Sequence, residues 1–288
     1  METYQPRQAI RSIVALTLGA LLVSPSAEAA QLKPETLDAW AAYISATEHR
    51  IEREHASNAG FLVQDFDDDA EGGRTAVRRG EVPVRRMETR QDDGSKIKVR
   101  KGAIHHWRGS IFIPGVTLGN VIDGVKSPLR QEDLQEDVLE SRVLEQDDDR
   151  MKVFLKLRRK KFITVHYNTE HEMRYTRHDG TRASSRSIAT KIAELKNAGT
   201  PLEEEKPAGN DRGFLWRLNS YWRYAEVDGG VIVECESVSL SRSIPAAVRW
   251  MVTPLIRSAA RESMTRTLTS MRARLLAGVD TTPVADAQ

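Results

Sequence analysis

The sequence holds a single cysteine, Cys235, among its 288 residues. One thiol cannot form an intramolecular disulfide, so the fold has to be held together by its core alone. A catalytic thiol is the alternative role for Cys235, but this residue lies in a stretch with the alternation of a β-strand. We therefore expect a buried small hydrophobic side chain there.

The sequence also lacks an excess of charge of either sign. Lys plus Arg number 43 and Asp plus Glu number 41, so no overall field favours nucleic acid as a partner. Beyond residue 30, no apolar stretch approaches the roughly 20 residues that a membrane-spanning helix needs. The remaining chain is long enough for one large domain with an appendage, or for two small domains.

The first 30 residues have the three parts of a secretory signal peptide. Arg7 and Arg11 are followed by an uncharged apolar run at residues 13–23, and Ala27-Glu28-Ala29 places small residues at the cleavage site. An uncleaved anchor or a buried helix is the alternative. We expect cleavage near Ala29 or Ala30, and a periplasmic or secreted protein.

Residues 31–101 read as an extension made of a helix and a hairpin. Apolar residues at helical spacing predict a helix over residues 34–54. The acidic stretch at 65–73 predicts an exposed loop, and two β-patterned runs at 82–90 and 96–100 predict a hairpin.

Residues 102–278 carry the pattern of an antiparallel sheet with a long terminal helix. A short helix capped by Thr117 is expected at 117–125, and Pro254 is expected to kink or divide the terminal helix. An apolar stripe of Met264, Leu268, Met271 and Leu275 marks one face of that helix, and Gly278 ends it, leaving a tail at 279–288. Strands are predicted at 103–113, 138–145, 150–160, 163–177, 181–195, 213–227 and 231–242, with a long loop at 196–211. The order predicts an α+β fold, an antiparallel sheet covered on one face by helices.

The histidines do not form a metal or catalytic pattern. His105 and His106 are adjacent, so on a strand they point to opposite faces and cannot hold one ion together. No Ser-His-acid set is identifiable, and we expect neither a metal site nor a cofactor. His171 as a general base of a cyclase- or hydrolase-type enzyme stays open as an alternative.

Several runs of the sequence resemble the START-like superfamily of helix-grip proteins. They are residues 104–109 (IHHWRG), 111–115 (IFIPG), 211–222 (DRGFLWRLNSYW) and 231–245 (VIVECESVSLSRSIP). The resemblance spans residues 32–276, but relatives carry an aromatic-Pro pair where this chain has residues 127–132 (SPLRQE). It implies a curved antiparallel sheet packed on the long C-terminal helix, with a cavity between them for a lipid, sterol, polyketide or other apolar molecule.

Alternation along the strands identifies candidates for the lining of such a cavity. The candidate ligand-binding residues are Leu155, Tyr167, His171, Trp216, Leu218, Trp222, Tyr224, Val233, Cys235, Met264 and Leu268. The alternative is that these side chains pack against the helix and leave no cavity. A bulge in a Trp-bearing strand would reverse the predicted face.

Basic residues gather at 156–161 (KLRRKK) and along the terminal helix. They form either a solvated face paired with acids such as Glu132, Asp133 and Asp137, or a surface for transient contact with anionic membranes. The leading interpretation is an exported START-like protein that binds an apolar ligand of lipid type. The alternatives are an enzyme that acts on a hydrophobic substrate and a cavity-free structural module of the cell envelope.

Overall fold

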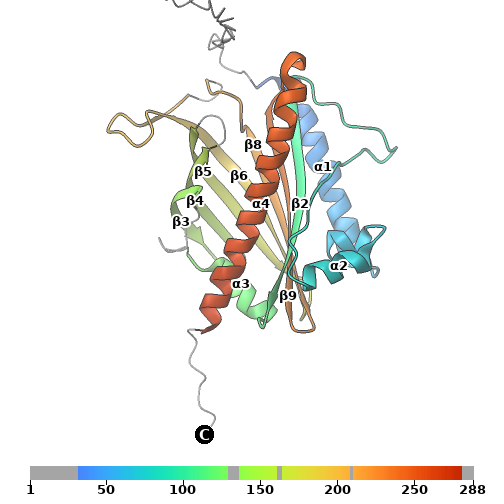
Figure 1. Ribbon diagram of the computed structural model, residues 1–288. Helices are drawn as coiled ribbons and strands as arrows, with labels where there is room; N and C mark the ends of the chain where they lie inside the picture. Colours follow the sequence, from blue (N-terminus) through green and yellow to red (C-terminus); the bar gives the residue numbers. More distant parts are fainter. Residues whose placement is uncertain (1–31, 129–135, 161–163, 208–209, 281–288) are drawn as a thin grey trace, which may run out of the picture.

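The computed structural model describes residues 32–128, 136–160, 164–207 and 210–280. They form an antiparallel sheet in the order β1-β2-β9-β8-β6-β5-β4-β3, with β7 added to β6 (Figure 1). The strands are β1 Val84–Arg86, β2 Gly102–Pro114, β3 Val138–Gln146, β4 Arg150–Lys160, β5 Thr164–Arg177, β6 Arg182–Lys196, β7 Glu204–Glu205, β8 Arg217–Val227 and β9 Gly230–Arg242. The helices are α1 Pro34–Ala56, η1 Val63–Phe66, α2 Ala70–Arg78, α3 Leu118–Lys126, η3 Ala246–Val248 and α4 Arg249–Asp280. The predicted signal peptide lies outside the described residues.

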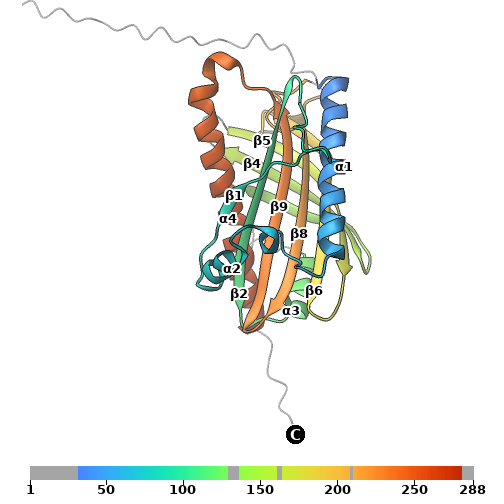
Figure 2. The same ribbon diagram turned by 90° about the vertical axis from the view of Figure 1, so that its right-hand side faces the viewer.

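Helices lie on both faces of the sheet (Figure 2). On one side, here called the α4 face, Met264 and Leu268 of α4 and Leu118 of α3 join a core cluster with β2 and β9. On the other side, the α1 face, Trp40 and Tyr43 of α1 pack on residues of β8 and β9. The long terminal helix across one face of a curved antiparallel sheet makes this a helix-grip α+β fold. No helix within the described ranges combines the length and apolarity needed to cross a membrane.

Local signals place several elements as the sequence predicts. The Thr117 hydroxyl accepts a hydrogen bond from the Asn120 amide at 3.2 Å and so caps α3. Pro34 stands in the first turn of α1, where its missing amide hydrogen has no partner to lose. The β8–β9 hairpin turns at Gly229, which has a φ of 81° that favours glycine.

The acidic stretch at 65–73 is not the exposed loop that the sequence predicts. It contains the end of η1 and the start of α2. The Asp69 side chain accepts from the Gly72 amide and caps α2, and Asp65 accepts from the amides of Phe61 and Leu62. These carboxylates accept hydrogen bonds from backbone amides of the same segment, and the bonds stabilise short helices within the acidic run.

Two further predictions need correction. Of the two outcomes expected for Pro254, a kink or a division of the terminal helix, the division is wrong, because Pro254 lies inside the single helix α4. It leaves the carbonyl of Trp250 without its helical partner, and Trp250 is 78% exposed, so water can take the place of the missing amide. The hairpin expected at 82–100 is reduced to the short β1 and a single bridge between Arg90 and Lys96.

Candidate functional site

Helix α4 covers only part of the α4 face. It packs mainly on β2, β1 and α3. The predicted apolar stripe makes this contact, since Met264, Leu268 and Leu275 are buried in it. Gly109 of β2 allows the close approach, because a Cβ there would lie 2.6 Å from Met264 Cγ. The strands β6, β5, β4 and β3 extend beyond this contact.

Five of the predicted ligand-binding residues are packed in the contact under α4. Tyr224, Val233, Cys235, Met264 and Leu268 belong to one buried cluster. Burial raises the pKa of the Cys235 thiol, so it stays protonated, as a structural cysteine does. These side chains form the buried core of the α4 face.

Three predicted residues remain half-buried on the same face: Leu155, Leu218 and Trp222. Trp222 is the cross-strand neighbour of Ser185, and Leu218 that of Ser239. Trp222 and Leu155 touch the edges of buried clusters without being enclosed by them. These three side chains keep part of their surface exposed on the α4 face, on β4 and β8.

Tyr167 and His171 add polar groups to this face from β5. Tyr167 is 3% exposed, and its hydroxyl has no hydrogen-bond partner among the described residues. Burial lowers the pKa of His171 to about 4, so the imidazole is neutral at pH 7. Its Nε2 lies 3.1 Å from the Thr169 hydroxyl.

Trp216 does not belong to the α4 face, and its predicted face is wrong. It packs with Trp40 and Tyr43 of α1, and its indole nitrogen donates to Asp211 Oδ1 at 3.1 Å. The pairing of β8 with β9 begins at Arg217. Trp216 therefore stands outside the ladder, and the alternation that predicts its face does not extend to it.

Two further features lie on the α4 face. Trp107 of β2 is buried in the cluster under α4. Its cross-strand neighbour Ser237 begins a row of serines that continues through Ser220 to Ser187. This row depends on the pairing of β9, β8 and β6, and only the register shows it.

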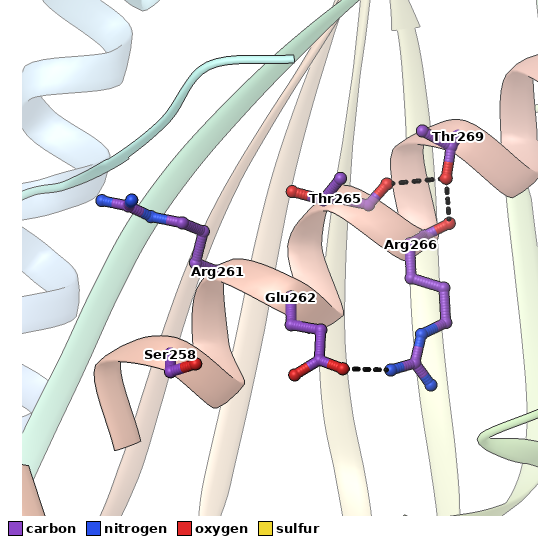
Figure 3. A pocket seen from close by; sticks show the side chains of 6 residues that line it. All are labelled: Ser258, Arg261, Glu262, Thr265, Arg266 and Thr269. Atoms are coloured by element: carbon purple, nitrogen blue, oxygen red, sulfur yellow. Dashed lines mark hydrogen bonds and ion pairs between the residues drawn. The ribbon is translucent and has the colours of Figure 1, made fainter. Parts of the chain in front are cut away.

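An open groove of about 600 Å³ runs along α4 (Figure 3). It is lined by Ser258, Arg261, Glu262, Thr265, Arg266 and Thr269. Arg266 pairs with Asp137 at 3.1 Å and with Glu262 at 3.3 Å. Asp137 also accepts from Arg159 of β4 at 3.1 Å. The expected pairing of the basic helix with Asp137 is confirmed, whereas Glu132 and Asp133 lie outside the described residues.

The α1 face carries a buried polar network. His106 lies between the Tyr43 hydroxyl, 2.8 Å from its Nδ1, and Glu236 Oε1, 2.7 Å from its Nε2. Burial raises the pKa of Glu236, but the His106 hydrogen bond and the charge of Arg50 outweigh it and bring the pKa down to about 2. Glu234, also buried, accepts from the amide of Val63 at 2.5 Å. The network ties α1 and η1 to the sheet.

His105 and His106 lie on opposite faces, as expected. His105 contacts the Ser241 hydroxyl at 2.9 Å, on the other side of the strand from the His106 network. Over the described ranges, no group of three or more His, Cys, Asp or Glu residues is arranged to hold a metal ion.

Comparison with known proteins gives distant structural likenesses only. No family model matches the chain. No curated protein matches it either. The STAR-related lipid transfer protein fragment from Xanthomonas axonopodis is 16% identical with a TM-score of 0.42, covering 62% of this chain and 95% of that one. The Zhui aromatase/cyclase from Streptomyces sp. R1128 is 9% identical with a TM-score of 0.41, covering 64% and 100%.

A START superfamily protein from Mycobacterium smegmatis is 5% identical with a TM-score of 0.38, covering 59% of this chain and 96% of that one. The fold of the protein is therefore assigned from its own strand order and its terminal helix. By these features, the protein has a helix-grip α+β fold.

Proposed function

We propose that this protein is exported and binds an apolar ligand of lipid type on the α4 face, between the sheet and α4. The observation that carries the proposal is the half-buried apolar surface of Trp222, Leu218 and Leu155 beside the α4 contact. Ligand sites combine such apolar and aromatic walls with a few polar groups that fix orientation. Tyr167 and His171 supply polar groups on the same face.

A ligand of this kind has to be loaded from a membrane, and we propose that the first turns of α4 make that contact. Trp250 is 78% exposed and Met251 is 50% exposed. Residues 237–261 contain no Asp or Glu but include Arg242, Arg249, Arg257 and Arg261. Exposed Trp beside Arg is typical of segments that lie at the surface of anionic bilayers. In Figure 1 this end of α4 lies opposite the end that adjoins α3.

The two contacts can be tested separately with two tryptophan variants. Binding of 11-(dansylamino)undecanoic acid would be followed by fluorescence, and binding to phosphatidylglycerol vesicles by co-sedimentation. Trp222→Ala should weaken probe binding about tenfold and leave vesicle binding intact. Trp250→Ala should do the reverse. Wild-type protein that binds no probe would contradict the ligand proposal and favour a cavity-free module. Vesicle binding unchanged by Trp250→Ala would contradict the proposed contact.

A further inference from the structure

The α1 face is covered by its helix over only part of its width. Trp40 and Tyr43 of α1 share a core cluster with Tyr221 of β8 and Val238 of β9. The sheet continues past this contact through β6, β5, β4 and β3, and Figure 1 shows β3, β4 and β5 on the side of the sheet away from α1. The part of the α1 face on β3 to β6 is here called the open half.

Three arginine side chains, here called the arginine row, stand next to one another on the open half. Arg186 of β6 is the cross-strand neighbour of Arg174 of β5, and Arg174 is that of Arg150 of β4. Arg186 pairs with Glu48 of α1 at 2.7 Å, which places the row on the α1 face. Directly opposed side chains are about 5 Å apart at Cβ, and like charges in such positions destabilise a sheet. The stability of the fold therefore does not account for the row.

The middle arginine of the row has no acidic partner. Arg186 has Glu48, and Arg150 lies 3.9 Å from Asp149. Arg174 is exposed, and its guanidinium forms no hydrogen bond or ion pair with any described residue. A guanidinium presents its N–H donors in a fixed fork that matches the oxygens of an oxyanion. Arg174 therefore keeps these donors available for a ligand.

Other cations of the open half have acidic partners. Lys152 pairs with Glu170 at 3.2 Å, and Lys191 pairs with Glu205 at 2.9 Å. Positive charge without a partner is thus concentrated at Arg174, where the two flanking arginines add to it.

A hollow of about 810 Å³ lies at the arginine row. All three arginines line it, and its lining also includes Lys152 and the acids Glu145, Asp147 and Glu172. Glu145 and Glu172 are the cross-strand neighbours of Lys152, so these two acids stand in the row beside the arginines. One anionic group at Arg174 is attracted by the arginine row, whereas further negative charge would approach these carboxylates and be repelled.

We propose that the arginine row binds a single phosphoryl group, carried by inorganic phosphate or by a small soluble phosphate monoester whose remainder is neutral or cationic. A phosphoryl group offers three acceptor oxygens, which allow it to accept from Arg174 and from a flanking arginine at the same time. The site lies on the opposite face of the sheet from the proposed lipid site and does not depend on it.

Calorimetric titration at low salt with O-phosphoethanolamine and with tripolyphosphate tests this assignment. We expect the monoester to bind more tightly, because the acids of the hollow repel the additional charge of tripolyphosphate. An unspecific basic surface would instead prefer the more highly charged anion. Arg174→Gln should weaken monoester binding about tenfold or more. Arg142→Gln, which removes another exposed arginine, paired with Glu140 at 2.7 Å, should leave it unchanged. Glu172→Gln should strengthen the binding of tripolyphosphate.

Several results would overturn the assignment. Tighter binding of tripolyphosphate by the wild type, or equal losses in Arg174→Gln and Arg142→Gln, would mean that anions are attracted without a specific site. Binding to phosphatidic acid vesicles that depends on Arg174, with no binding of the soluble monoester, would replace the soluble ligand by a lipid head group.

Two further measurements on Arg174→Gln separate a binding role from a structural one. The variant should melt at or above the wild-type temperature, because the substitution relieves the repulsion between like charges. A lower melting temperature would show that Arg174 supports the fold and would overturn the assignment. The variant should also keep the wild-type affinity for the dansyl probe, so that a failure of this inference leaves the proposed function standing.

Discussion

At the scale of single residues, the α4 face contains two groups of side chains: those buried under α4 and those that keep exposed surface. Tyr224 and Leu268 are fully buried under the helix, whereas Trp222 and Leu155 keep exposed surface. A binding role needs both groups, because the buried ones hold the reachable ones in place. Substitutions of the buried side chains should therefore lower the stability of the fold, whereas substitutions of the exposed ones should lower the affinity for the ligand.

Trp216→Ala should lower the free energy of unfolding by about 3–5 kcal/mol, as truncation of a buried aromatic side chain does. Trp216 is 6% exposed and packs against α1. The folded variant should keep the wild-type affinity for the dansyl probe, since Trp216 lies away from the α4 face. Urea unfolding and probe titration on the same sample measure both quantities. A stable variant with weakened probe binding would mean that Trp216 contacts the ligand.

His171 should make the protein less stable as the pH falls from about 6.5 towards 4. Burial lowers its pKa to about 4, whereas an unfolded histidine titrates near 6.5. The unfolded chain therefore takes up the proton first, and stability is complete above about pH 6.5 and lost below it. The loss amounts to roughly 3 kcal/mol when pH 4 is reached.

The variant His171→Gln should show a flatter dependence of unfolding free energy on pH over this window. His55, whose pKa burial and Arg223 lower to about 3, is present in both proteins and cancels in the comparison. Chemical unfolding at several pH values measures the difference. Parallel curves for the two proteins would mean that His171 is not held neutral in the fold.

At the scale of elements, the contact between α4 and β2 is fixed by a glycine facing an apolar stripe. Gly109 leaves the space that Met264 and Leu268 fill. Helix α1 is held by an apolar cluster that includes Trp40 and Tyr43, and also by the charged and polar groups around His106 and Glu236. Because the second contact is a buried network of titratable groups, the attachment of α1 should depend on pH more than that of α4.

Gly109→Ala should lower the free energy of unfolding by about 1–3 kcal/mol, because the new methyl group overpacks the contact. Its Cβ would lie 2.8 Å from Leu268 Cδ1. Leu268→Ala alone should cost about 2–5 kcal/mol. The double variant should lose less free energy of unfolding than the sum of the two single losses, because the added methyl group at position 109 no longer meets the Leu268 side chain. Gly180→Ala, with open space around it, serves as the control. Strict additivity in urea unfolding would contradict the close approach of α4 to β2.

At the scale of the whole molecule, the proposed function needs an open α4 face and a route to a membrane. The sheet extends to β3 beyond the α4 contact, and the exposed Trp250 stands at the start of the helix. Export would place the protein outside the cytoplasmic membrane. The two properties are independent and can be checked apart from ligand binding.

The mature protein should begin near Ala30 or Gln31 and be recovered outside the cytoplasmic membrane. The reason is the signal-peptide pattern of Arg7, Arg11 and the apolar run that follows them. N-terminal sequencing of protein from a periplasmic extract and from the medium measures this. An intact Met1 on protein confined to the cytoplasm would contradict export.

Local features of the sequence predicted most of the fold. Strand spans follow from alternation, the α3 start follows from Thr117, and the buried face of α4 follows from its stripe, because each depends on residues a few positions apart. The face on which Trp222 and Leu155 lie was predicted because the alternation holds along β8 and β4.

Tertiary structure decided the features that the sequence did not predict, because these features depend on which distant residues become neighbours. The face of Trp216 depends on where the β8–β9 ladder begins. The acidic run at 65–73 forms caps because amides of the same segment lie within reach. Glu236 meets Arg50 and His106 only once α1 packs on the sheet. The serine row joins positions 187, 220 and 237 through register alone, and no local period in the sequence encodes register between strands that are far apart.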